Sequence, residues 1–194
     1  MTPMDLTEKR DIILTHELTF ANEIGTALFE KPKVSVWMIF IPILFLYFIF
    51  RMQKFRNDRM KFSTEFMAAR REAMALAYDA SAAKGPAGND GVKRSAKLPE
   101  PLQEPYGLWI KALSSLYLDL LSADGNDFDA LVRRAYRTRA EYLDTLDRVN
   151  QLEKAFYAAL KPLMSEVEGS EAIIASLESE SWRLRRATAD RIFR

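Results

Sequence analysis

The residue types that most often carry out catalysis or bind metals are scarce in this chain. Its 194 residues include one histidine and no cysteine, which excludes disulfides, thiolate metal sites, cysteine nucleophiles and a histidine-based zinc cage within one chain. His16 and Glu17 begin like the zinc-protease motif HExxH, but the fifth position is Phe20. That motif needs two histidines on one helix face to hold zinc. The sequence therefore excludes this enzyme class, and we expect His16 at a surface or an interface.

A short acidic segment is the second candidate site. Residues 124–129 read DGNDFD, which suggests calcium ligands. An EF-hand loop, however, needs glycine at its sixth position and glutamate at its twelfth, where this chain has Asp129 and Ala135. We therefore expect a turn, in which Gly125 ends one helix and Asp127 caps the next.

Charged residues elsewhere follow helix faces. The carboxylates that stand out lie on such faces, so we expect them to be solvated and predict no catalytic residue, cofactor or metal. Arginines cluster at residues 133–139 and again near the C-terminus, either as a salt-bridged surface or as a site for an anionic partner. Residues 99–194 have a net charge of −3, which argues against nucleic acid as that partner. The candidate anionic-partner patch is Arg183, Arg185, Arg186 and Arg191.

One long apolar segment is the most distinctive feature among the predicted secondary-structure elements. Residues 34–50 read VSVWMIFIPILFLYFIF and contain no charge; as a helix they would span about 25 Å, near the lower limit for crossing a bilayer. We interpret them as an uncleaved membrane anchor. Proline at the centre either kinks a spanning helix or forms the apex of a hairpin with both flanks on one side, and we favour the span. The predicted anchor residues are Lys33, Trp37, Pro42, Tyr47 and Arg51.

Basic residues follow this segment and predict its orientation. Residues 51–98 hold eleven basic and five acidic residues, a net charge of +6. Lysine and arginine collect on the cytoplasmic side of a membrane, so we expect a single-pass protein, with its N-terminus outside and its C-terminal domain cytoplasmic, in a bacterial inner membrane. Contact with anionic lipid is expected at Lys54, Arg56, Arg59 and Lys61.

Helical periodicity describes the rest of the chain. No strand pattern is evident, so the predicted fold is all-α: a single-pass anchor, a long juxtamembrane helix and a C-terminal helical hairpin or three-helix bundle. The predicted segments are an amphipathic helix (1–33), the anchor (34–50), a basic, alanine-rich helix (51–84), a flexible linker (85–101) and the helical domain (102–194).

The C-terminal domain is expected to contain three helices, the first over residues 105–123 and the second over 128–161. The second carries apolar residues at seven-residue steps with others between them, a pattern typical of coiled-coil packing. We expect this seam to contact a partner helix through Phe128, Leu131, Ala135, Tyr142, Leu146, Val149, Leu152, Phe156 and Leu160.

These observations favour a structural function. We expect a non-enzymatic, membrane-anchored helical adaptor, or an accessory or assembly subunit of a larger complex. Its expected contacts are membrane lipid and either protein partners at helical faces or further copies of itself. A single-pass signalling or regulatory protein is the alternative, followed by an enzyme or an RNA-binding protein.

Overall fold

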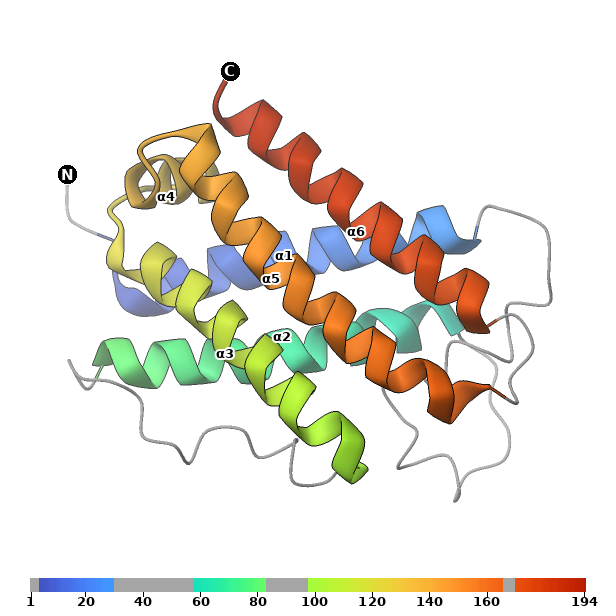
Figure 1. The fold of residues 1–194 in the computed structure, drawn as a ribbon. Coiled ribbons are helices and arrows are strands. Elements are labelled where there is room, and N and C mark those ends of the chain that lie inside the picture. The colour runs from blue at the N-terminus through green and yellow to red at the C-terminus, as the bar shows by residue number, and fades with distance from the viewer. Residues whose placement is uncertain (1–3, 30–57, 83–97, 166–169) are drawn as a thin grey trace.

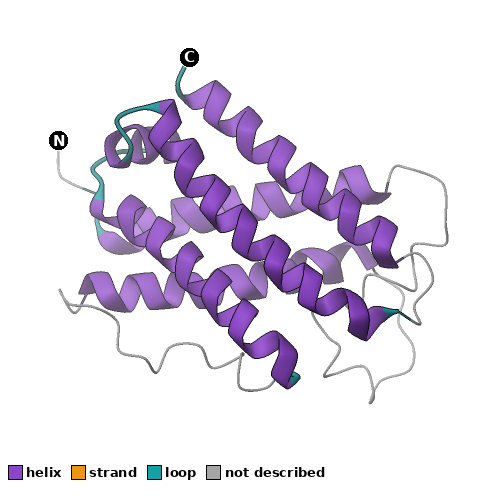
Figure 2. Ribbon diagram, viewed as in Figure 1, coloured by secondary structure: helices purple, strands orange, loops and turns teal. Residues whose placement is uncertain are grey.

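The computed structural model describes residues 4–29, 58–82, 98–165 and 170–194. These residues are helical, with short connecting turns and no strand among them (Figure 2). The elements are α1 (Leu6–Phe29), α2 (Asp58–Ala82), α3 (Glu100–Ser122), α4 (Phe128–Ala135), α5 (Arg139–Leu160), the 3-10 turn η5 (Lys161–Met164) and α6 (Ser170–Ile192). The structure therefore confirms the all-α fold and the helical bundle.

The helices form two layers (Figure 1). Helices α1 and α2 run antiparallel in one layer, and α3, α5 and α6 cross them diagonally in the other. The short helix α4 lies at one end and contacts α1, α3 and α6. Helix α2 packs mainly on α1 and α3, and α5 packs on α3 and α6. One hydrophobic core joins all of them.

This packing contradicts the predicted membrane topology. No helix within the described residues is long and apolar enough to cross a membrane. Moreover, α1 packs directly on α2, α3 and α6, although the predicted topology put α1 on the opposite side of the membrane from the other three. The prediction of a single-pass protein with its N-terminus outside and its C-terminal domain in the cytoplasm is therefore wrong. Residues 34–50, the predicted anchor, lie outside the described residues.

The basic helix after that segment belongs to the bundle and is not an isolated stalk. Helical spacing predicts one apolar face on this helix, and four residues of that face, Phe66, Ala69, Ala73 and Ala77, are at most 2% exposed. They form the buried face of α2. Because three of the four are alanines, neighbouring backbones can approach this face closely.

Helix α1 begins with a capping box, in which Asp5 and Glu8 each accept a hydrogen bond from the other's backbone N–H, at 2.8 and 3.1 Å. The helical spacing of Leu14, Leu18, Ala21, Ile24 and Leu28 predicts an apolar stripe on this helix. Leu18 is nevertheless 41% exposed, whereas Lys9 and Ile13 are buried. The buried face of α1 therefore includes charged positions.

Two boundaries in the C-terminal half differ from the predictions. Helix α3 begins at Glu100, so Pro105 lies inside the helix; the extra turn buries Leu102 in the core. The predicted continuous helix over residues 128–161 is two helices, because Thr138 starts α5 with a capping box to Glu141.

Candidate functional site: a buried charge network and an arginine-rich end

A fully buried arginine lies where α1, α2 and α5 meet. Arg70 of α2 is 0% exposed. Its Nε donates to Glu17 Oε2 of α1 at 2.8 Å and its Nη1 donates to the Phe66 carbonyl at 3.2 Å. Its Nη2 lies 3.7 Å from Glu153 Oε1 of α5. Burial lowers the pKa of Arg70, but the two carboxylates outweigh this effect and raise it. The guanidinium therefore stays charged inside the core.

The network continues from Glu153 into α6. Glu153 is 1% exposed, and its Oε2 lies 2.7 Å from Arg185 Nη2. Arg185, 7% exposed, also donates to Asn150 Oδ1 at 3.3 Å, and Tyr157 donates to Glu153 Oε1 at 3.4 Å. Acidic and basic residues alternate from α1 through α2 and α5 to α6, so the buried charges sum to zero.

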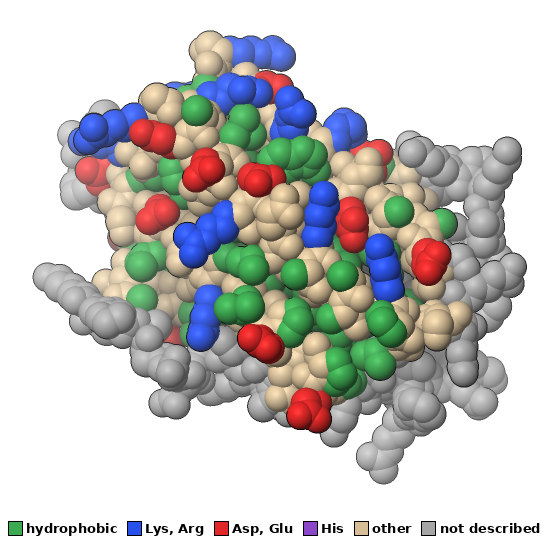
Figure 3. All heavy atoms as spheres, in the orientation of Figure 1, with side chains coloured by type: hydrophobic (Ala, Val, Ile, Leu, Met, Phe, Trp, Pro, Cys, Tyr) green, Lys and Arg blue, Asp and Glu red, His purple; other side chains and the backbone are tan. Residues whose placement is uncertain are grey.

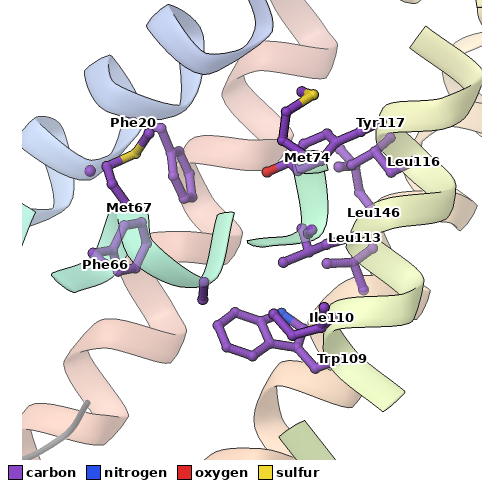
Figure 4. Packing of buried hydrophobic residues seen from close by; sticks show 14 of the residues in the cluster. Phe20, Phe66, Met67, Met74, Trp109, Ile110, Leu113, Leu116, Tyr117 and Leu146 are labelled. Carbon is purple, nitrogen blue, oxygen red and sulfur yellow. The ribbon is translucent and has the colours of Figure 1, made fainter. Parts of the chain in front are cut away.

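Aromatic rings lie close to these charges, and Figure 4 shows the rings of Phe20, Phe66 and Trp109 in the hydrophobic core. The Arg70 guanidinium lies 3.5 Å from the centre of the Phe66 ring. Phe20 lies near both arginines, with its ring centre 5.6 Å from Arg70 Cζ and 5.5 Å from Arg185 Cζ. Phe20 and Phe66 come from α1 and α2, and Trp109 enters the same core from α3. The rings offer their negative faces to the cations.

This network was not among the sequence-based predictions, which assigned basic residues to membrane topology or to surface patches. The signal was nevertheless present, since Arg70 lies four residues after Phe66 and three before Ala73, on the apolar stripe of α2. Glu153 occupies the equivalent place on α5, four residues after Val149. A charge on an apolar stripe indicates a buried pair when another helix supplies its partner.

Helix α3 adds a buried hydroxyl beside the network. Tyr117 is 0% exposed. Burial raises its pKa well above 10.0, and the negative charge of Glu17 adds to the effect. Its hydroxyl faces that carboxylate but makes no well-formed hydrogen bond within the described part of the chain. Tyr117 is therefore a neutral donor at the edge of the charge network.

His16 lies next to Glu17 and contacts α4. Its ring stacks on Phe128 with centres 3.6 Å apart and planes 12° apart. Burial lowers its pKa below 6.5, an effect that Glu17 opposes. The neutral imidazole is therefore the native form at neutral pH, and it helps to hold α4 on α1.

The acidic segment forms the expected turn with Asp127 as the cap, but α3 ends at its C-cap Ala123 and not at Gly125. Asp127 Oδ1 accepts from the Ala130 N–H at 2.8 Å and starts α4. Asp129 binds both terminal nitrogens of Arg191 on α6. The described residues contain no group of three or more histidine and acidic side chains placed to hold a metal ion.

Most of the predicted partner seam lies inside the chain's own core. Leu131, Tyr142, Leu146, Val149, Phe156 and Leu160 are all at most 4% exposed, and Phe128, Ala135 and Leu152 are half-buried against the same core. In this fold the seam contacts the chain's other helices. Any partner protein has to use other surfaces.

Two arginine clusters, separated by about fifty residues in the sequence, meet at the α4 end of the bundle. Arg133 donates to the Ile192 carbonyl at 3.2 Å, and Arg139 donates to Asp190 at 2.6 Å. The Arg191–Asp129 pair makes a third link. We call this surface the arginine-rich end and define it as residues 127–141 and 186–194. On the face in Figure 3, Lys and Arg side chains gather along the corresponding upper edge.

The charges of this surface do not balance. It contains seven arginines and four acidic residues, a net charge of +3. All four acids are engaged, because Asp127 and Glu141 cap helices and Asp129 and Asp190 pair with arginines. Within the described residues, no carboxylate forms an ion pair with Arg134, Arg137 or Arg186, and all three side chains are exposed.

The predicted anionic-partner patch is divided by the fold. Arg185 lies in the core network, whereas Arg183 is exposed and pairs with Glu180 at 2.7 Å. Arg186 and Arg191 are exposed and belong to the arginine-rich end.

The remaining predicted contacts with membrane lipid cannot be placed. Arg59 and Lys61 fall in α2, with their side chains outside the described part of the structure. The other predicted anchor and lipid-contact residues, Lys33, Trp37, Pro42, Tyr47, Arg51, Lys54 and Arg56, fall in residues 30–57 and also lie outside it.

Comparison of the chain with protein families, with characterised proteins and with solved structures finds no match in any of the three.

Proposed function

We propose that this protein is a non-enzymatic helical adaptor or accessory subunit that binds an acidic segment of a partner protein at its arginine-rich end. The observation that carries the proposal is the meeting of two arginine clusters on one surface, where Arg134, Arg137 and Arg186 have no acidic partner among the residues that the structure describes. Arginine side chains bind carboxylates in paired geometry and are enriched at protein interfaces.

Two further features favour a protein partner. The described side chains include no fully exposed aromatic residue, and stacking on exposed rings is a main source of affinity for single-stranded nucleic acid. The helical domain also has a net negative charge, which repels a long polyanion but leaves room for a short acidic segment at the basic end.

The buried carboxylates support a binding role over an enzymatic one. Glu17 and Glu153 are both held by arginines inside the core. Ion pairs within the fold therefore account for the positions of both carboxylates.

The test uses the full chain and a fluorescent peptide of alternating glutamate and alanine. We expect salt-sensitive binding that the double variant R134E/R137E weakens at least tenfold, about 1.4 kcal/mol. The matched control is K111E/K154E, which makes the same change in net charge at two exposed lysines of α3 and α5. This control should bind the peptide as the unaltered protein does, within about twofold.

Equal losses in the two double variants would show that net charge alone drives binding, and would refute a specific site. Retention of an RNA oligonucleotide or of anionic vesicles in preference to the peptide would refute the protein-partner class. After a positive result, a photo-crosslinking residue at position 137, compared with one at position 154, would identify the partner in cells.

A further inference from the structure

A small, partly open cavity lies beside the charge network and is lined by residues of α1, α3, α5 and α6, with Phe128 of α4 at one side. Its volume is about 30 Å³. Leucine side chains of α3, together with Leu146 and Val149 of α5, form much of its wall. Those two are at most 4% exposed, whereas Phe128, His16 and Thr188 are half-buried. The cavity is therefore deep in the core on the α5 side and nearer to the surface on the α4 side.

Polar groups reach the same cavity from four helices. Glu17 comes from α1, Tyr117 from α3, Tyr142 from α5 and Arg185 from α6. A purely structural void between leucines does not require such groups. Here a carboxylate, two phenols and a guanidinium line one cavity of about 30 Å³.

The hydrogen bonding of this group is incomplete. Glu17 accepts from Arg70, and Arg185 donates to Asn150. The Tyr117 hydroxyl is fully buried and has no well-formed partner within the described residues. A buried hydroxyl without a hydrogen bond costs about 1–3 kcal/mol, so the site calls for an additional acceptor beside Tyr117.

We propose that the cavity is an internal hydration site that binds one or two ordered water molecules, which accept from Tyr117 and donate to Glu17. One water needs roughly 10–15 Å³ of such space and two to four polar partners, and the cavity offers both. The bound water links α1 to α3 beside the poorly formed contact between the Tyr117 hydroxyl and the Glu17 carboxylate.

The first test asks whether the cavity is wet or dry, without altering the protein. Xenon enters dry apolar cavities, so methyl resonances of Leu116 and Leu146 are followed by NMR under xenon pressure. We expect no saturable xenon-dependent shifts at these methyls. Saturable shifts confined to the cavity would show that it is dry, and would overturn the proposal.

The second test fills the cavity. Val149→Ile adds a methylene to the wall, and Val132→Ile, at a buried valine that does not line the cavity, is the matched control. If water is bound, Val149→Ile displaces it, leaves Tyr117 without a partner and lowers the melting temperature more than the control does. If Val149→Ile is as stable as the unaltered protein, or loses no more stability than Val132→Ile, the cavity holds no structural water.

Discussion

Replacing Arg70 with methionine should strongly destabilise the bundle. The substitution keeps a long apolar side chain but removes the charge from a fully buried site. Glu17, with a side chain only 14% exposed, loses its 2.8 Å partner, and Glu153 retains only Arg185. An unpaired buried charge of this kind costs about 3–5 kcal/mol.

This cost is large relative to the stability of a typical domain, which is about 5–15 kcal/mol. For urea unfolding with a slope of about 2 kcal/mol/M, the midpoint should fall by about 1.5–2.5 M. Far-UV circular dichroism follows the transition directly, since the described residues are almost entirely helical. The neighbouring Arg71 is exposed, so Arg71→Met is the matched control and should change stability by no more than about 0.5 kcal/mol.

The double variant E17L/R70M separates charge from packing. If the unpaired carboxylate causes the loss, removing it should make the double variant more stable than R70M alone. The reasoning is refuted if R70M unfolds at the same urea concentration as R71M, or if the double variant is the less stable of the two. Either result would mean that removing the Arg70 charge leaves no costly unpaired carboxylate in the core.

Three further predictions concern α4 and its connections. Because burial lowers the pKa of His16 below its unfolded value of 6.5, its neutral form is favoured in the native state. The stability of the native protein should therefore fall from about pH 7.5 to 5.5 more than that of His16→Phe, which keeps the stack on Phe128; parallel pH profiles in urea unfolding would contradict this. Thr138→Ala removes the capping box of α5 and should cost about 1 kcal/mol, seen as a lower thermal midpoint; an unchanged midpoint would show that the cap contributes little. Gly125→Ala would place a Cβ atom 2.7 Å from the backbone nitrogen of Leu131 and should cost about 1–3 kcal/mol, unless α4 shifts freely, in which case calorimetry would show little change.

Local signals predicted much of the secondary structure. Apolar periodicity indicated helices, and Asp127 was correctly expected to cap the helix after the acidic turn. The break between α4 and α5 had an equally local signal, the sequence Thr138-x-x-Glu141, but the seven-residue apolar pattern runs through it and concealed it. Because the two helices place their apolar residues on one shared core, the pattern continued even though the helix did not.

The candidate site was less predictable, because it depends on contacts between helices. Arg70 and Arg185 look alike in the sequence to Arg71 and Arg186, their exposed neighbours. Only the apolar stripe distinguishes them, and which acid each one meets depends on the packing of four helices. The joining of two arginine clusters at one end is also a tertiary property. The predicted localisation rested mainly on the apolar segment at 34–50. The contacts between α1 and the later helices contradict that localisation.

The alternating charges of the core bear on how this protein can change during evolution. Each arginine has a close acidic partner from a different helix, Glu17 for Arg70 and Glu153 for Arg185. Loss of one member leaves the other as an unpaired charge in the core. A lineage can therefore lose or reverse these charges only by changing both positions of a pair within a short interval. Positions 17 and 70 should therefore covary in descendants of this chain, as should positions 153 and 185, while the exposed arginines beside them drift independently.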